Sequence, residues 1–323
     1  GYTTRGLGSD RNLGISLHSG FIGLGGTTSL RYALFVGQSG LGLPDEEYYR
    51  DERFTDILTA YREHVAETLT LAGLDASEAD AIVALETEIA ARHWDKVRTR
   101  DLRQMYNPTR PEPFSERIDW LRMFRAAGID ELEQLIDAQP SYAIDVVELL
   151  GSERLPAWRA WARFHLLSAL SPYLPEAFVQ ARFGFYGTTL NGIPTNRERW
   201  KRGVALVENL MGDALGKLYV ERHFPPDHKA RMDQLVANLR EAYRVSITNL
   251  EWMTPETRER ALTKLDKFTP KIGYPKRWRD YSELVVRRDD LYGNYQRGHA
   301  LEYDRELAKL GGPVDRDEWF MTP

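Results

Sequence analysis

Residues 183–226 decide the fold class, and they read FGFYGTTLNGIPTNRERWKRGVALVENLMGDALGKLYVERHFPP. Apolar side chains recur in this stretch at helical spacing, at Trp200, Val204, Val207, Met211, Ala214 and Leu218. Such spacing gathers the apolar side chains into one stripe along a helix. The stretch therefore predicts a long amphipathic helix over residues 196–222.

This helix has sequence signals at its ends and an unusual feature inside. Thr195 and Glu198 fit a capping box, in which each side chain satisfies a backbone N–H of the first turn. The proline pair at 225–226 predicts the end of the helix. Gly212 and Gly216 lie in the interior, where each costs about 1 kcal/mol relative to alanine. We therefore expect both glycines to pack closely against a neighbouring backbone.

Helical periodicity continues through most of the chain. We expect longer helices over 45–71, 77–94, 156–170, 227–252, 254–268 and 289–310, and shorter ones over 114–127, 130–138 and 141–150. Gly73 and the Gly311–Pro313 stretch predict helix ends, and Thr254 with Pro255 predicts a helix start. In the 227–252 helix, five side chains are expected to face inward: Met232, Leu235, Leu239, Tyr243 and Leu250. Core packing is also the expectation for four tryptophans on helical patterns: Trp158, Trp161, Trp200 and Trp252.

The first 44 residues are glycine-rich and differ from the rest. The apolar stretches Leu13–Leu17 and Leu30–Val36 predict two strands of a small hairpin-like sheet. Residues 107–113, NPTRPEP, predict a loop. Gly20 and Gly25 have the spacing of a phosphate-binding loop, but Gly26 stands where such a loop needs lysine. The predicted fold class is mainly α, with a large multi-helix domain and a small β element near the N-terminus.

Composition is that of a globular protein without thiol chemistry. The chain has 323 residues and a net charge of −5, which gives no support to a surface for nucleic acids or anionic membranes. It contains no cysteine, so disulfides and thiolate zinc sites are excluded. No run reaches the roughly 18 apolar residues that a membrane-spanning helix needs. The chain starts at Gly1 without methionine, so we expect its true start to lie upstream.

Histidines are the candidates for metal binding, and none forms a convincing site. His223 and His228 are five apart with two prolines between them, whereas a helical zinc pair needs a spacing of four with a glutamate between. His64 is followed by Glu67, and this pattern is more typical of an exposed face of an amphipathic helix. There is no His-Glu-x-x-His and no Gly-x-Ser-x-Gly motif. We therefore assign no catalytic, cofactor-binding or metal-ligating residue in this chain.

Several strings together carry a family resemblance. They are residues 183–226, LEWMTPETRERALTKLDKFTPKIGYPKRWRDY at 250–281, VDRDEWFMTP at 314–323 and QSGLGLPDEEYYRDE at 38–52, with ALETEIA at 84–90 and MYN at 105–107. In these strings the chain resembles the neprilysin-type zinc metallopeptidases, family M13. Because it has no cysteine, the chain resembles the bacterial members of this family rather than the disulfide-rich animal members.

The resemblance implies an organisation and a function. It implies a Gly-rich segment over 1–44, a helical cap domain over 45–270, and a linker with the start of a catalytic domain over 271–323. The longer parent would be a zinc metalloendopeptidase that cleaves peptides inside a size-restricting cavity. This chain would supply the wall of that cavity and be inactive alone, with zinc and the missing C-terminal catalytic domain belonging to the parent.

Two other interpretations stay open from the residues. One is a stand-alone helical module that binds peptides or proteins without catalysis. The other is an unrelated helical enzyme whose site is assembled from distant residues. The sequence also leaves the compartment open between the bacterial cytoplasm and secretion.

Overall fold

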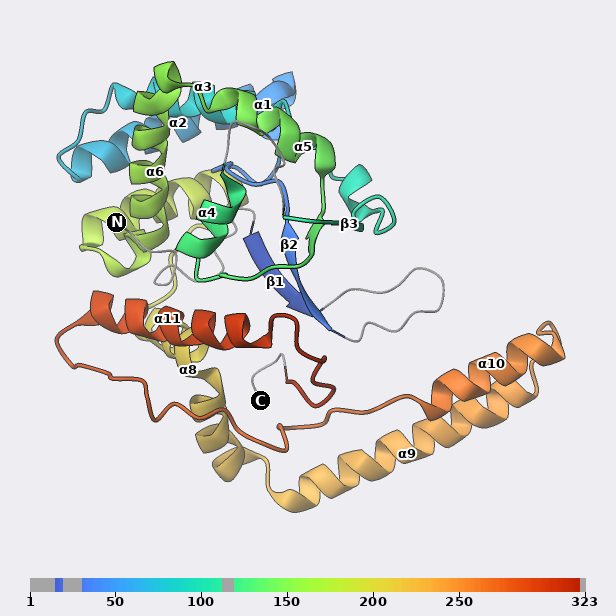
Figure 1. Cartoon of the computed structure of the whole chain (residues 1–323). Coiled ribbons are helices and arrows are strands. Elements are labelled where there is room, and N and C mark those ends of the chain that lie inside the picture. The colour runs from blue at the N-terminus through green and yellow to red at the C-terminus, as the bar shows by residue number, and fades with distance from the viewer. Residues whose placement is uncertain (1–14, 20–30, 112–118, 320–323) are drawn as a thin grey trace. The chain divides into compact units, whose positions relative to one another are not determined.

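A computed structural model describes residues 15–19, 31–111 and 119–319. The chain divides into two compact units. The first unit combines Gly1–Glu198 with Leu284–Val314, and the second combines Arg199–Glu283 with Asp315–Pro323. Helices dominate both units, which confirms the predicted mainly-α fold (Figure 1).

The predicted hairpin near the N-terminus is present in the first unit. Strand β1, Ile15–Ser19, pairs antiparallel with β2, Tyr32–Val36. In β2 the side chains of Tyr32, Leu34 and Val36 are buried and alternate with half-buried ones, as expected for a strand with one face on a core.

Two further short strands extend this sheet. Strand β4, Leu135–Asp137, pairs parallel with β2, and β3, Asn107–Thr109, pairs antiparallel with β4. The order is β1-β2-β4-β3 (Figure 1). The predicted helix over 130–138 is therefore wrong, and the loop predicted over 107–113 begins as a strand. Both errors have one cause, because a three-residue strand exists only through pairing with distant segments.

Eight α-helices of the first unit are described. They are α1 (Glu47–Arg50), α2 (Thr55–Leu71), α3 (Glu78–Ala90), α4 (Trp120–Ala126), α5 (Pro140–Asp145), α6 (Leu155–Leu170), α7 (Glu176–Arg182) and α11 (Leu291–Lys309). A π-helix, Phe183–Thr189, continues α7. The predicted helices over 156–170 and 289–310 are confirmed, whereas the range 45–71 divides at Asp51, whose backbone is extended, into α1 and the longer α2. Gly73 ends α2 as predicted, since its φ of +70° suits glycine.

The described residues of the first unit form two hydrophobic cores. The larger core joins α2, α3, α6 and the π-helix, and its fully buried members include Tyr61, Leu69, Ile82 and Phe164. The smaller core lies against the sheet and is formed by Leu34, Val36, Trp120, Phe124, Ile129, Leu135 and Val147. The segment that follows β2 runs from the smaller core to the larger one.

Helix α11 is tied to the sheet side of the first unit. The hydroxyl of Tyr303 donates to the carbonyl of Ala127 at 2.6 Å. Beyond the helix, the Tyr32 N–H donates to the carbonyl of Gly312 at 3.0 Å. Gly311 has a φ of +71°, in keeping with the predicted end of this helix. Hydrogen bonds between residues 170 or more positions apart in the sequence therefore hold α11 and the segment after it in the first unit.

Three α-helices of the second unit are described. They are α8 (Arg199–His223), α9 (Pro226–Thr248) and α10 (Pro255–Asp266). Thr254 caps α10 as predicted, because its hydroxyl accepts from the Thr257 N–H at 3.2 Å. Helices α9 and α10 pack on each other, and the Arg240 guanidinium donates to the Leu265 carbonyl at 3.2 Å.

Helix α8 departs from the prediction in two ways. It begins at Arg199, so Thr195 is not its cap. Its backbone is also non-helical at Met211, with φ −151° and ψ 46°, which breaks the predicted stripe into two helical segments. Gly212 follows the break and is buried together with Gly216, in keeping with close packing of both glycines.

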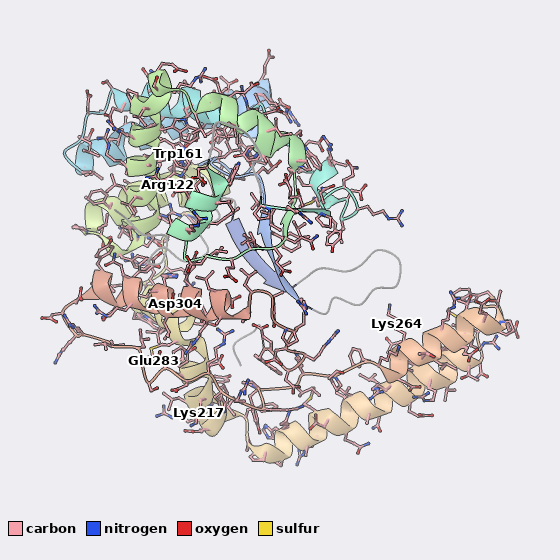
Figure 2. All side chains as sticks on the ribbon, in the orientation of Figure 1. Arg122, Trp161, Lys217, Lys264, Glu283 and Asp304 are labelled. Atoms are coloured by element: carbon pink, nitrogen blue, oxygen red, sulfur yellow. The ribbon has the colours of Figure 1, made fainter. Side chains whose placement is uncertain are left out.

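The predicted inward faces of the second unit are exposed. Met232, Leu235, Leu239 and Tyr243 of α9 are all exposed, so that prediction is wrong. Trp200 and Trp252 are 64% and 75% exposed, whereas Trp161 is buried and Trp158 packs against the larger core. The sequence correctly predicted a helix with an apolar stripe at α9. The prediction that this stripe faces inward failed because no described segment covers it. Figure 2 shows the side chains of α9 and of α10, on which Lys264 is labelled.

The larger core gives a stability test. Phe164→Ala should lower the free energy of unfolding by about 3–5 kcal/mol, because it removes a fully buried ring and leaves a cavity. Denaturant titration followed by circular dichroism measures this change. Val97→Ala, at a side chain that is 72% exposed, is the control and should stay within about 0.5 kcal/mol. Equal effects of the two variants would contradict the assignment of this core.

Candidate functional site

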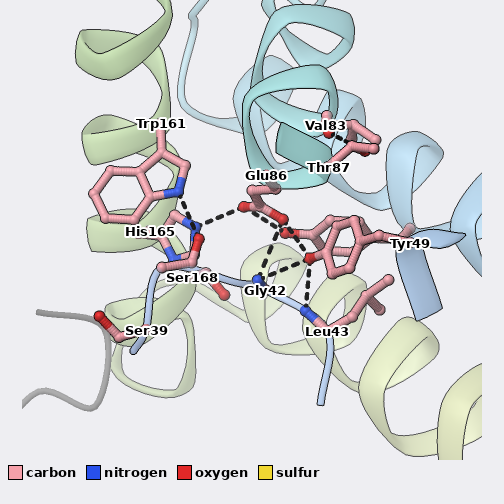
Figure 3. A network of polar contacts seen from close by, with 12 residues as sticks. Ser39, Gly42, Leu43, Tyr49, Val83, Glu86, Thr87, Trp161, His165 and Ser168 are labelled. Carbon is pink, nitrogen blue, oxygen red and sulfur yellow. Dashed lines mark hydrogen bonds and ion pairs between the residues drawn. The ribbon is translucent and has the colours of Figure 1, made fainter. Parts of the chain in front are cut away.

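The most concentrated polar chemistry of the described residues surrounds Glu86 on α3. Its side chain is fully buried in the larger core. The Tyr49 hydroxyl from α1 donates to Glu86 Oε2 at 2.6 Å, and the Tyr61 hydroxyl from α2 donates to Oε1 at 3.1 Å (Figure 3). A buried carboxylate is stable only when such donors replace water.

Two more donors complete the shell of Glu86. His165 Nε2 on α6 lies 2.7 Å from Oε1, and the Gly42 N–H donates to Oε2 at 3.2 Å (Figure 3). Three helices and one loop therefore meet at a single carboxylate. We call Glu86, Tyr49, Tyr61, His165 and Gly42 the Glu86 network.

The electrostatics of the Glu86 network keep both phenols neutral. Burial first, and then the negative charge of Glu86, hold the pKa values of Tyr49 and Tyr61 well above their usual range. A neutral hydroxyl can donate to the carboxylate, whereas a phenolate would repel it. The Tyr49 oxygen also accepts from the N–H groups of Gly42 and Leu43, each at 3.1 Å.

The loop that carries Gly42 is held along its whole length. Trp161 Nε1 donates to the Gly40 carbonyl at 3.0 Å, the Tyr142 hydroxyl to the Ser39 carbonyl at 2.9 Å, and the Tyr186 hydroxyl to the Gly42 carbonyl at 3.1 Å. A Cβ at position 42 would overlap the Tyr61 hydroxyl, so this close approach requires glycine.

This arrangement organises the fold and leaves no reactive group open. Both carboxylate oxygens of Glu86 accept two hydrogen bonds each, and the side chain has no solvent access. A general acid or base must reach a substrate proton at hydrogen-bond distance. The Glu86 network therefore offers no catalytic function in this conformation.

The histidine pair considered from the sequence is not brought together as a metal site. His223 ends α8, where its ring lies 4.8 Å from that of Tyr219, and His228 on α9 lies 6.1 Å from the ring of Phe224. Within the described ranges, no group of three His, Cys, Asp or Glu side chains has the arrangement to hold a metal ion.

His64 contradicts the sequence-based expectation of an exposed position. It is only 4% exposed, whereas Glu67 on the same helix is exposed. The side chain of His18 lies outside the described residues. His299 on α11 is half-buried, and burial lowers its pKa.

The sequence analysis missed Glu86, although a signal was present. Ile82, Leu85 and Ile89 are buried on the inner face of α3. Glu86 stands four residues after Ile82 and three before Ile89, so helical spacing already places it on that face. A carboxylate in an apolar stripe predicts buried partners, but the pattern does not name them.

Comparison with known proteins decides the family. The model for the amino-terminal region of peptidase family M13 matches residues 5–275. The chain belongs to peptidase family M13. It is a neprilysin-type member, as the resemblance in the sequence implied.

Individual M13 relatives support the same assignment. The chain is 27% identical to human endothelin-converting enzyme 1 over 316 residues, which cover 89% of the chain and 40% of that protein. It is 27% identical to a putative zinc metalloproteinase of Streptococcus gordonii, with 89% of the chain and 53% of that protein covered. The zinc metalloprotease Zmp1 of Mycobacterium tuberculosis, solved with an inhibitor, is 49% identical and has a TM-score of 0.87.

The M13 match covers most of this chain and only part of its relatives. The Zmp1 structure covers 98% of the chain, but the chain covers 48% of Zmp1. The chain thus spans about half the length of the relatives that it matches. Among the helices that the structure describes, none combines the length and apolar character needed to cross a membrane.

The Glu86 network generates a prediction on stability. Glu86→Gln should lower the free energy of unfolding by about 1.5–3 kcal/mol, because it removes charge-assisted hydrogen bonds from Tyr49 and His165. Glu88→Gln, two residues along the same helix and 42% exposed, is the matched control and should change little. Denaturant titration of both variants measures the difference, and an unchanged Glu86→Gln midpoint would refute the role of the network.

His93, which holds the same loop, generates a prediction on pH. Its Nε2 lies 3.0 Å from the Ser39 carbonyl, and burial lowers its pKa to about 4. The unfolded chain, with an imidazole pKa near 6.5, takes up the proton first. The contribution of neutral His93 to stability is therefore present above about pH 6.5 and is lost as pH falls towards 4.

Titration of the His93 ring by NMR checks this pH dependence. In the folded chain the midpoint should lie near pH 4, and in urea-unfolded chain near 6.5. A midpoint near 6.5 in the folded chain would show that the ring is not buried as described.

Proposed function

We propose that this chain is the helical, non-catalytic portion of a neprilysin-like zinc metalloendopeptidase. In this proposal the chain forms a wall of an internal cavity that admits peptides and excludes folded proteins. The division into a segment over 1–44, a cap domain over 45–270 and a linker over 271–323 belongs to the same proposal. The observation that carries it is the M13 match over residues 5–275 in a chain that spans about half of its relatives.

The positions of potential zinc-ligating side chains in the described residues support a non-catalytic role for this portion. Zinc in peptidases is held by three protein side chains, commonly histidine and carboxylate. The described residues do not fit that requirement, because they contain no such group of three and because His223 and His228 each lie against an aromatic ring. In the proposal, the remaining part of the longer protein holds the zinc, and no catalytic step is assigned to this chain.

The exposed apolar surface of the second unit supports a larger protein. Neither α9 nor α10 contains a buried residue, although α9 carries an apolar stripe of exposed side chains. Trp252 and Tyr243 are 75% and 61% exposed. Apolar surface of this kind is typical of a face that another segment or protein covers, and the remaining part of the peptidase would be that cover.

A comparison of the chain with its longer parent tests this function. The purified chain should contain no bound zinc and should not hydrolyse a quenched fluorescent peptide. The parent should bind zinc and cleave the peptide. It should also cleave a small protein after that protein has been unfolded, but not while it is folded. Metal content by mass spectrometry and cleavage rates provide the two measurements.

The outcomes separate the parts of the proposal. Chelator-sensitive hydrolysis by the chain alone would show that it is not the non-catalytic portion. Equal cleavage of the folded and unfolded forms of one protein would eliminate size exclusion by a cavity. A gene that encodes this chain alone, with peptide binding and no hydrolysis, would establish the stand-alone binding module instead.

A further inference from the structure

His64 is a buried ionisable group that the Glu86 network does not use. It lies in the middle of α2 and is 4% exposed. Both of its ring nitrogens, Nδ1 and Nε2, are without a hydrogen-bond partner in the described part of the chain. Buried polar groups are nearly always paired, so an unpaired imidazole at this depth calls for a physical reason.

Aromatic rings surround the imidazole. The Phe185 ring stacks on it with centroids 5.1 Å apart and planes 9° from parallel. Tyr186 meets it edge-on at 5.4 Å, and Phe164 does so at 6.2 Å. Phe185 and Tyr186 both belong to the π-helix, so His64 is a contact of α2 with that element, next to Tyr61, whose ring lies 5.4 Å from that of Phe185. π-Helices occur frequently at functional sites.

Besides burial, the cationic side chain of Arg182 shifts the pKa of His64. Arg182 of α7 lies 4.6 Å from the centre of the Tyr186 ring and donates to Ser168 Oγ at 3.0 Å. Burial first, and then the charge of Arg182, lower the pKa of His64 to about 4. The surroundings of the imidazole therefore favour its neutral form.

The other titratable groups around this core do not offset that preference. Glu86 of α3 is bound by Tyr61 of α2, by Tyr49 of α1 and by His165 of α6. Tyr186 of the π-helix stays neutral, because burial raises its pKa to about 12. On α2 itself, Glu67 and Glu63 point to the exposed face.

Protonation would make this packing unfavourable. A neutral imidazole has one N–H donor, whereas the imidazolium has two. No acceptor meets either nitrogen in the described structure, so the second donor would also be buried without a partner. The added charge would be desolvated and would face Arg182.

The π-helix lies shortly before the start of the second unit in the sequence. The π-helix ends at Thr189, and residues 190–198 lead from it to α8, which begins the second unit at Arg199. The contact of His64 with the π-helix therefore lies close in sequence to one of the three places where the chain passes between the two units.

We propose that His64 is a proton-sensitive latch, which holds the π-helix on α2 while it is neutral and releases it when it is protonated. Acid would then loosen the segment that leads from the first unit to the second. The proposal does not depend on the peptidase function, since it rests on His64, its aromatic neighbours and Arg182.

Hydrogen exchange of the folded chain at pH 7.5 and pH 5.5, corrected for intrinsic exchange rates, tests the latch. In the wild type, protection of peptides from residues 183–198 should fall by about tenfold at pH 5.5. This factor follows from an imidazole that titrates near 4 in the fold and near 6.5 when released. In His64→Phe, which keeps the stacked ring and cannot be protonated, protection should change by less than about twofold.

A matched control separates the latch from general acid sensitivity. His93→Phe removes a half-buried histidine whose pKa is also lowered to about 4, and the acid loosening of 183–198 should persist in it. Loss of protection in His64→Phe equal to that of the wild type would overturn the proposal. So would a loss at pH 5.5 that is uniform over α3 and the π-helix.

A second measurement covers the case in which His64→Phe does not fold. His64→Leu replaces the ring by a smaller apolar side chain and should show the same pH-independent protection. In the wild type, protection at residues 183–198 should fall as pH drops below about 6.5, while the NMR midpoint of His64 in the folded chain lies near pH 4. A His64 ring that is fully protonated while the π-helix stays protected would refute the latch.

Discussion

The burial of one carboxylate constrains most of the first unit. Glu86 carries its charge into an apolar core, where unpaired ions are strongly disfavoured. Its hydrogen bonds come from Tyr49, Tyr61, His165 and Gly42, which belong to α1, α2, α6 and the loop after β2. Each partner is needed to satisfy the charge, so the relative positions of these elements follow from a single requirement.

The loop after β2 transmits this constraint to the sheet. Gln38 exchanges two hydrogen bonds with the backbone of Trp94, and its N–H donates to the side chain of Gln139, which follows β4. Ser39 and Gly40 are held by side chains from α5 and α6. The larger helical core and the smaller core beside the sheet are thus connected by residues 38–43. In this stretch side chains bind the N–H groups of Gln38, Gly42 and Leu43 and the carbonyls of Ser39, Gly40 and Gly42.

Sequence reasoning succeeded where structure is local. The helices over 156–170 and 289–310, the cap at Thr254 and the stop at Gly73 were all predicted, because each depends on residues within a few positions of one another. It failed where distant segments decide. Leu135–Asp137 became a strand through pairing with β2, about a hundred residues earlier. His64 became buried because α6 and the π-helix pack their aromatic rings against it, and the stripe of α9 was expected to face inward although no described segment covers it.

The sequence by itself determined a mainly helical chain, its membership of family M13 and the absence of the His-Glu-x-x-His motif. Helical periodicity also placed Glu86 on the inner face of α3. Only the tertiary structure decided what satisfies that carboxylate and what surrounds His64. The physical reason is that periodicity and capping act over three or four residues, whereas the partners of Glu86 lie 25 to 79 positions away in the chain. A pattern can show that a polar group must be buried, but only folding brings its partner to it.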